Sequence, residues 1–493
     1  SYSFPLRTVL RINKDKQSYL GAFSNSSPDF TYQRTAQIIQ ASDLETDVKW
    51  KGTFDSSLTS YVACLCKLIA MHAESRGASS ISISWSYPSS MNSSGIRKMK
   101  SVWNDAVAEY IESLGVSVEI REENEAVAPY LYYARTEGIQ GRTVAMDIGG
   151  ETVDILLTGF TAADKMHLSS FRLGGNTLLE SPSNAQTSGA GLCMSLKNYL
   201  EDAKTNIQGD ALNYVNEGIS RMEASLNAGQ GKEGAEYFFA LERIIKPPYN
   251  KSINLNLADI LGDEDLEQAH FRSLILIYFL AQVYHVAKLT SAGDIAVPDN
   301  FVFSGNGSRL LRSLGDKNFL SKLITEVFVW VYDKSGRRSD GPIEIKAQHS
   351  DKPKVATAYG MLYRSERDQV SPIPLLLIHS DKLLCGDAAS NVDTANDLVD
   401  EQVKTLADIN ELVSLFKHLI ERLRLVKDQG YTEASLDLIA KELANTKVNG
   451  QVFASIVVPH IRYNQEITEC LLFTLLRERI KQIGIELYNN LCK

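Results

Sequence analysis

Residues 147–154 read Asp147-Ile-Gly-Gly-Glu-Thr-Val-Asp154, between two apolar stretches. Thr143–Met146 has the composition of a strand buried on both faces, and Ile155–Thr158 follows the glycines, so a hairpin is expected. Glycines at its tip let backbone N–H groups approach an anion, and the hydroxyl of Thr152 adds a donor. Asp147 is suited to hold the water shell of Mg²⁺. The pattern indicates a phosphate-binding turn; an ordinary glycine hairpin with a solvated Asp147 is the alternative.

A second glycine turn lies in Phe301-Val-Phe-Ser-Gly-Asn-Gly-Ser-Arg309. A buried strand here runs into a turn that opens a helix, and a helix N-terminus is favourable for a phosphate group. A tight turn whose glycines serve backbone geometry alone explains this segment as well. Glu125 follows the strand Val116–Ile120 at the start of a predicted helix, where its carboxylate either orients a water molecule or interacts with the helix dipole.

The composition excludes several classes of protein. The chain has 493 residues and a formal net charge of −9, and at about 100–200 residues per domain this length predicts roughly two to four domains. An acidic chain without a basic cluster is not expected to bind nucleic acid. Six cysteines without metal-ligand or disulfide spacing indicate a reduced, cytoplasmic protein. The longest apolar run, Leu274–Ala281, is too short to span a membrane.

Hydrophobic periodicity predicts helices and strands in alternation through the first part of the chain. Helices are expected at 57–77, 94–114 and 125–136, and strands at 80–85, 116–120, 166–173 and 301–303. Residues 176–270 are expected to be mostly helical, with polar loops at 227–234 and 247–250. The tail from residue 397 is helical, as a packing extension of the body or a partner-binding surface. The predicted domains are 1–140, 141–365 and 366–493.

In order and spacing these segments resemble the actin-like ATPase superfamily, and most of all the ATPase domain of the seventy-kilodalton heat-shock chaperones. Residues 147–154 resemble its second phosphate motif, and residues 301–310 its adenosine motif. Glu123-Asn-Glu-Ala-Val-Ala-Pro-Tyr-Leu resembles its Asn-Glu-Pro-Thr-Ala-Ala-Ala segment, and Lys354-Val-Ala-Thr-Ala-Tyr-Gly-Met-Leu the helix after the adenosine motif. Residues 82–89 and 169–176 complete a collinear set, which is more specific than any single motif.

The resemblance implies a two-lobed actin-like (ribonuclease H-like) α/β ATPase fold with a helical C-terminal extension, and with ATP and Mg²⁺ between the lobes. Asp147 would hold the hydration shell of Mg²⁺, and Glu125 would position the attacking water. The β- and γ-phosphates would be contacted by Gly149, Gly150 and Thr152, and the adenosine would be bordered by Gly305, Gly307, Ser308 and Arg309. The turns near residues 149 and 306 are expected to face each other across a crevice and to hold opposite ends of one nucleotide.

Three departures from the family bear on this expectation. The first phosphate hairpin has no counterpart in Ser1–Phe30, so the chain is expected to be either a fragment of a longer protein or a degenerate relative. Glu151 replaces a usual glycine, and a carboxylate beside phosphates is unfavourable unless it points away. The catalytic lysine is not placed; Lys49 and Lys51 are candidates, with a solvated surface charge as the alternative for each.

The expected function is an ATP-binding, chaperone-like switch that acts on a protein partner through lobe motion, with slow ATP hydrolysis left open. One alternative is a nucleotide-binding scaffold that has lost catalysis. Another is a filament-forming actin-like protein. Neither nucleic acid nor a membrane is expected as a partner, and the sequence does not indicate the oligomeric state.

Overall fold

A computed structural model of the chain describes residues 8–13, 18–24, 44–45, 56–87, 93–159, 166–182, 190–229, 231–245, 253–292, 296–336, 344–349, 353–363, 373–374, 395–462 and 470–492. The chain divides into two compact units. The first is formed by Ser1–Tyr87, Met91–Asn124 and Lys197–Leu255, and the second by Pro88–Ser90, Glu125–Leu196 and Asn256–Lys493. This division does not follow the predicted boundaries near residues 140 and 365. The candidates Lys49 and Lys51 and the predicted loop at 247–250 lie outside the described residues.

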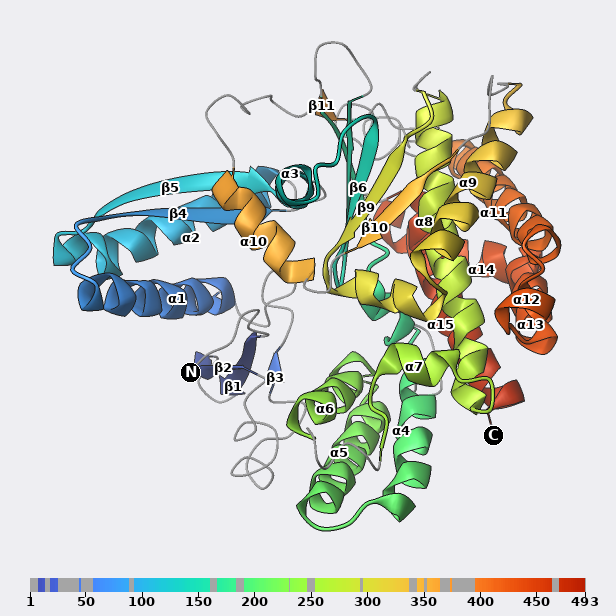
Figure 1. Ribbon diagram of the computed structural model, residues 1–493, viewed down its shortest axis with the longest axis horizontal. Helices are drawn as coiled ribbons and strands as arrows, with labels where there is room; N and C mark the ends of the chain where they lie inside the picture. The colour runs from blue at the N-terminus through green and yellow to red at the C-terminus, as the bar shows by residue number, and fades with distance from the viewer. Residues whose placement is uncertain are drawn as a thin grey trace. The chain divides into compact units, whose positions relative to one another are not determined.

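The first unit contains two small sheets and several helices (Figure 1). Strand β1 (Thr8–Asn13) pairs antiparallel with β2 (Ser18–Ser24) and with β3 (Leu44–Glu45). Strand β4 (Ser80–Tyr87) runs parallel to β5 (Ser117–Asn124). The helical elements are α1 (Ser56–Ser75), α2 (Ser93–Tyr110), η3 (Glu112–Leu114), η5 (Lys204–Asn206), α5 (Asp210–Asn227) and α6 (Gly231–Ile244).

The predicted helices and strands of this unit are confirmed, and they share one core. Val62 and Cys66 of α1, Ile83 of β4, and Val107 of α2 pack in a buried cluster. Burial raises the pKa of the Cys66 thiol to about 11, so this side chain is a neutral apolar residue at physiological pH. The loop predicted at 227–234 is wrong in its second half, because α6 begins at Gly231.

The second unit is built on a six-stranded mixed sheet in the order β10-β9-β6-β7-β8-β11. Its strands are β6 (Thr143–Ile148), β7 (Val153–Thr158), β8 (His167–Phe171), β9 (Asn300–Ser304), β10 (Lys346–His349) and β11 (Ile373–Pro374). The predicted hairpin is present: β6 pairs antiparallel with β7, Asp147 opposite Asp154. Strand β9 runs parallel to β6, with Asp147 beside Ser304. Every residue of β6, β7 and β9 is buried, as expected for strands covered on both faces.

Helices cover both faces of this sheet (Figure 1). The contacts of successive side chains along β9 assign helices to each face. Val302 belongs to a core cluster with residues of α3 (Val127–Thr136) and α10 (Pro353–Tyr363). The neighbouring side chains point to the other face, where Phe303 contacts Phe279 of α8 (His270–Ala292) and Phe301 contacts Phe328 of α9 (Lys317–Lys334). The unit is therefore an α/β/α arrangement. Its further helical elements are η4 (Gly175–Leu178), α4 (Gly191–Ala203, which spans the division between the units), α7 (Leu257–Gly262), η7 (Glu267–Ala269) and η8 (Asn306–Ser313).

Helix α8 is the central helix of this unit. Residues Glu267–Ser291 are long and apolar enough to cross a membrane, but 94% of the most apolar window is buried inside the protein, as in the core helix of a compact domain. His285 of α8 lies buried against the rings of Phe171 and Phe473. Burial lowers the pKa of His285 to about 3, so this imidazole stays neutral.

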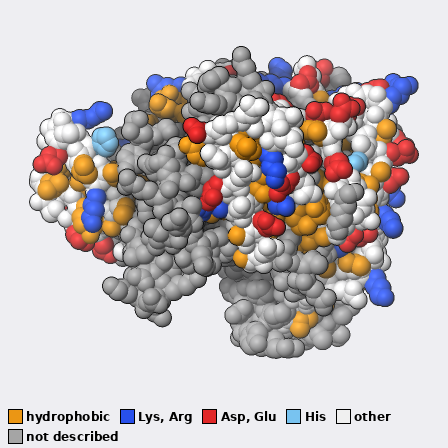
Figure 2. Space-filling view, turned by 90° about the horizontal axis from the view of Figure 1, so that it is seen from below, with side chains coloured by type: hydrophobic (Ala, Val, Ile, Leu, Met, Phe, Trp, Pro, Cys, Tyr) orange, Lys and Arg blue, Asp and Glu red, His pale blue; other side chains and the backbone are white. Residues whose placement is uncertain are grey.

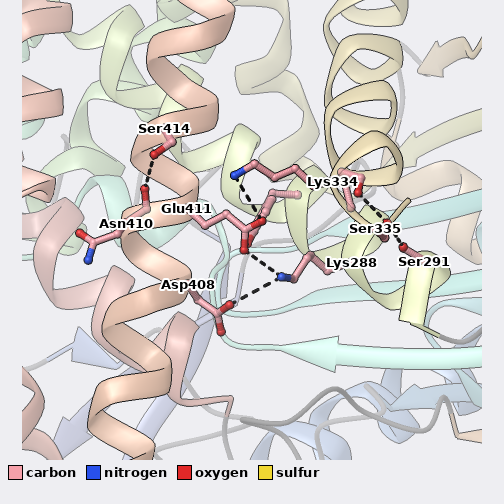
Figure 3. Close-up of polar contacts among 10 residues, drawn as sticks. Lys288, Ser291, Lys334, Ser335, Asp408, Asn410, Glu411 and Ser414 are labelled. Atoms are coloured by element: carbon pink, nitrogen blue, oxygen red, sulfur yellow. Dashed lines mark hydrogen bonds and ion pairs between the residues drawn. The ribbon is translucent and has the colours of Figure 1, made fainter. Parts of the chain in front are cut away.

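The C-terminal helices pack within the second unit. They are α11 (Ala395–Arg422), α12 (Leu425–Gln429), α13 (Glu433–Leu443), α14 (Thr446–Arg462) and α15 (Leu471–Leu491), and α11, α13 and α15 all contact α8. Figure 3 shows the polar cluster that joins α11 to α8 and α9: the Lys288 ammonium lies 2.9 Å from Glu411 and 3.9 Å from Asp408, and Lys334 lies 3.9 Å from Glu411. Of the two interpretations of the tail, packing against the body describes these helices.

Glu411 makes the stability of this contact dependent on pH. Burial alone raises the pKa of Glu411, but hydrogen bonds from Lys288 and Tyr284 and the charges of Lys288 and Lys334 outweigh it, so the pKa is lowered. The stabilisation is therefore present above the ordinary carboxyl pKa and is lost as the pH falls through the lowered value. We expect Glu411→Gln to reduce the free energy of unfolding by about 1 kcal/mol at pH 7, and by progressively less below pH 4.5.

Urea denaturation at pH 7 and at pH 3 checks this expectation. Glu421→Gln, on the exposed side of the same helix, is the control and should show no such pH dependence. A deficit of Glu411→Gln that is equal at both pH values would contradict the assigned ion pairs.

Charges of both signs are mixed on the surface that Figure 2 shows. On that face, the described Lys and Arg side chains lie among Asp and Glu side chains and do not gather into one basic patch.

Candidate functional site

Three turns meet at one edge of the six-stranded sheet. Because β6 and β9 are parallel, both run out at this edge, where the antiparallel β7 begins and β8 ends. The turn at 149–152 joins β6 to β7, residues 172–175 lead from β8 into η4, and residues 305–308 lead from β9 into η8. Strand pairing thus brings together the two glycine turns that the sequence singled out, although about 150 residues separate them.

The hairpin turn is closed by backbone hydrogen bonds on its own residues and on the η4 turn. The N–H of Gly149 donates to the carbonyl of Thr152 at 2.8 Å. The N–H of Gly175 donates to the carbonyl of Gly149 at 3.0 Å, and the N–H of Asn176 to that of Gly150 at 2.8 Å. These two glycine carbonyls therefore face the protein.

The turn at 305–308 lies directly on the hairpin turn. Gly305 has φ +77°, and a Cβ at this position would overlap the Asp147 carboxylate and the carbonyl of Ile148. A Cβ on Gly307 would lie 2.8 Å from the carbonyl oxygens of Ile148 and Gly149. The prediction of a crevice between the two turns is therefore wrong at Gly305 and Gly307, because neighbouring backbone occupies the space that a side chain would take. A bound molecule would have to lie over both turns.

Asp147 lies where the two turns meet. It is buried, and because Ala145 two residues earlier packs toward α3 and α10, Asp147 points to the same side of the sheet. There the hydroxyl of Thr357, on α10, donates to Oδ2 of Asp147 at 3.2 Å. The alternative of a solvated Asp147 is therefore wrong, because the carboxylate is buried and accepts a hydrogen bond from a helix far along the chain.

The side chains of Thr152 and Glu151 form hydrogen bonds with other residues at this edge of the sheet. The hydroxyl of Thr152 donates to Asp154 Oδ2 at 3.1 Å, so its lone pairs, and not its proton, are left for a ligand. This corrects the expectation that Thr152 supplies a hydrogen bond to phosphate. The amide of Asn176 donates to Glu151 Oε1 at 2.9 Å, which holds the Glu151 carboxylate against the η4 turn.

The remaining predicted residues occupy different environments. Ser308 is buried, and its hydroxyl donates to the carbonyl of Gly305 at 2.7 Å, which closes the turn. Arg309 is exposed. Glu125 is half-buried, two residues before α3, a helix that contacts both β6 and β9. The helix expected after Phe301–Phe303 is the 3₁₀ helix η8, whose poorer alignment of peptide groups weakens the predicted helix-dipole contribution.

The chemistry of this edge fits one hydrated cation and a phosphate group. Mg²⁺ takes oxygen ligands, keeps several waters and is bound through one or two carboxylates, and Asp147 supplies one. Among the described residues, no group of three His, Cys, Asp or Glu side chains could hold a metal ion.

Sequence reasoning missed Thr357 and Asn176. Thr357 lies in a segment predicted only to be a helix, and Asn176 ends the segment 169–176, to which no site role was given. Neither belongs to a spacing pattern that indicates a site, and only the pairing of distant elements brings them to Asp147 and Glu151.

Comparisons with known proteins give weak likenesses among solved structures. No protein-family model matches the chain, and no curated protein matches it. Among solved structures, MreB5 of Spiroplasma citri aligns with a TM-score of 0.32 and 10% identity. The structure bound to ADP covers 72% of this chain and 87% of that chain, and the structure bound to AMPPNP covers 72% and 86%. Similarity at this level does not by itself assign a function.

Proposed function

We propose that this chain is an actin-like, ATP-binding protein that holds the phosphates of ATP, with Mg²⁺, over the edge where β6, β7 and β9 meet. The observation that supports the proposal is the position of Asp147, a carboxylate at the junction of two glycine turns that strand pairing brings together. In this proposal, binding changes the conformation of the chain and thereby its interaction with a cytoplasmic protein partner.

Each group has a defined role in this proposal. Asp147 orients the waters of a Mg²⁺ ion, which neutralises phosphate charge when bound. Backbone N–H groups of the 149–152 turn approach the β- and γ-phosphates, other than that of Gly149, which donates to the carbonyl of Thr152. Gly305, Gly307 and the exposed Arg309 border the nucleoside, with Ser308 fixing the shape of their turn. Glu125 accepts a hydrogen bond from the attacking water if hydrolysis takes place.

A scaffold that binds nucleotide without hydrolysing it is the second candidate. It is favoured because the Thr152 hydroxyl already donates its hydrogen bond to Asp154 within the protein. With that donor engaged, the turn offers fewer hydrogen bonds to the charge that develops during phosphoryl transfer.

Calorimetric titration of the full chain with ATP, in Mg²⁺ and in EDTA, tests nucleotide binding. We expect Asp147→Asn to weaken ATP binding at least about 10-fold in Mg²⁺ and much less in EDTA, because the variant keeps the shape of the side chain and removes its charge. The matched control is Asp299→Asn at the opposite end of β9, where Asp299 pairs with Arg142 at 2.6 Å. Absence of binding by the unmodified chain, or equal losses for both variants, would overturn the proposed site.

An assay of phosphate release from ATP distinguishes an ATPase from a scaffold that binds ATP without hydrolysing it. If the chain is an ATPase, Glu125→Gln should abolish turnover and leave binding unchanged, while Glu137→Gln, just beyond the other end of α3, should have no effect. Tight binding without turnover in the unmodified chain would support the scaffold. A rise in light scattering on addition of ATP would instead indicate assembly into filaments.

A further inference from the structure

Thr357 approaches Asp147 from an element that is remote in sequence. It is buried on α10, 210 residues from Asp147, and its hydroxyl donates to Oδ2 at 3.2 Å. The other oxygen, Oδ1, lies against the Gly305 turn, because a Cβ on Gly305 would overlap it. The two oxygens of this carboxylate therefore have different environments.

The packing of α10 fixes the position of the Thr357 hydroxyl. One turn farther along α10, the backbone of Gly360 lies so close to α3 that a Cβ there would overlap the carbonyl of Ala128. Helix α3 is in turn tied to the sheet, since the hydroxyl of Tyr133 donates to the carbonyl of Phe303 at 2.7 Å. Helix α10 also contacts β9 and η8 directly. The Thr357 hydroxyl therefore lies on a helix whose position is fixed by contacts with α3, β9 and η8.

A buried aspartate needs such a partner for its orientation. Rotation about χ2 of Asp has a broad, roughly two-fold energy profile, so the side chain alone does not determine which oxygen faces which neighbour. A hydrogen bond to one oxygen selects an orientation and offsets the cost of burying the carboxylate.

We propose that Thr357 is a positioning residue for the candidate nucleotide site: its hydroxyl holds Oδ2 so that Oδ1 stays at the junction of the two turns, directed at the water shell of a cation. This role rests on the proposed function, since it presumes that Mg²⁺ and ATP bind at this edge. It does not make Thr357 a catalytic residue, because Thr357 acts through Asp147.

The test uses the full chain and measures ATP affinity by calorimetry in Mg²⁺ and in EDTA. Thr357→Val keeps the β-branched shape in the helix and removes the hydroxyl. We expect this variant to lose about 10-fold in affinity in Mg²⁺ and less than about twofold in EDTA, and Thr357→Ser to recover most of the loss. The control is Thr290→Val, which removes a buried hydroxyl that bonds only to carbonyls within α8 and should leave both affinities unchanged.

The outcomes separate this proposal from the proposed function. Unmodified chain that binds no ATP overturns both. Unmodified chain that binds ATP, with a Thr357→Val variant that binds equally well or loses affinity equally in Mg²⁺ and EDTA, overturns the positioning role alone. If Thr357→Val does not fold, as judged by its circular dichroism, the comparison is made with Thr357→Ala and Thr357→Ser, and equal Mg²⁺ dependence of those two overturns the role.

Discussion

Replacement of Gly305 by alanine is expected to lower the free energy of unfolding by about 4 kcal/mol. Two costs combine at this position. The backbone has φ +77° and ψ 156°, a region that L-residues with a side chain rarely adopt. The added Cβ would also overlap Asp147 Oδ1 and the carbonyl of Ile148, both in the buried end of β6, so the two turns would have to separate.

Gly336→Ala is the matched control for Gly305→Ala. Gly336 follows α9 with φ +71°, but a Cβ there meets nothing within 4 Å, so this variant pays only the backbone cost of roughly 1 kcal/mol. Urea denaturation of both variants, followed by circular dichroism, gives the difference between them. Equal destabilisation would show that the contact between the 305 turn and the end of β6 is loose, and would remove the geometric basis of the candidate site.

Replacement of Gly360 by alanine is expected to cost about 3 kcal/mol, although alanine is the better helix former by about 1 kcal/mol. Gly360 lies within α10, and its Cβ would overlap the carbonyl oxygen of Ala128, a backbone atom inside α3 that cannot turn aside. The two helices would be pushed apart. The hydrogen bond from Thr357 to Asp147 would then lengthen, because Thr357 lies on the same helix as Gly360 and would move with it.

Gly262→Ala isolates the effect of helix propensity. Gly262 ends α7, and a Cβ there meets nothing within 4 Å, so this variant should be neutral or slightly stabilising, by up to about 0.5 kcal/mol.

Hydrogen exchange of the full chain shows which helices are destabilised by Gly360→Ala. Amide exchange should become faster in α3 and α10. Slower exchange in these helices, or a stabilised variant, would mean that α3 and α10 are not in close backbone contact.

Much of the local structure was predictable from residue patterns. The largely apolar segments at 143–146 and 301–303 predicted buried strands, and the structure confirms both as central strands of one sheet. The glycines at 149 and 150 predicted the hairpin, because the strands on either side have strand composition and glycine allows the turn.

The shorter strands and the exact helix boundaries were not predictable. Strand β10 has a single partner, β9, and its four residues carry no alternating pattern that marks a strand. The sequence around residue 231 is rich in glycine, which indicates a loop, yet α6 begins there because α5 packs against its apolar residues. In both cases tertiary contacts outweigh local propensity.

The sequence by itself determined the strands, the two glycine turns and the place of a carboxylate at the end of β6, since these follow from the order of apolar, glycine and acidic residues along a short stretch of chain. Only the tertiary structure decided what the glycines accommodate and what holds Asp147. Both depend on elements far apart in sequence: β6 with β9, and β6 with α10, 210 residues away. Such contacts are selected by packing of the whole unit, and no local pattern encodes them.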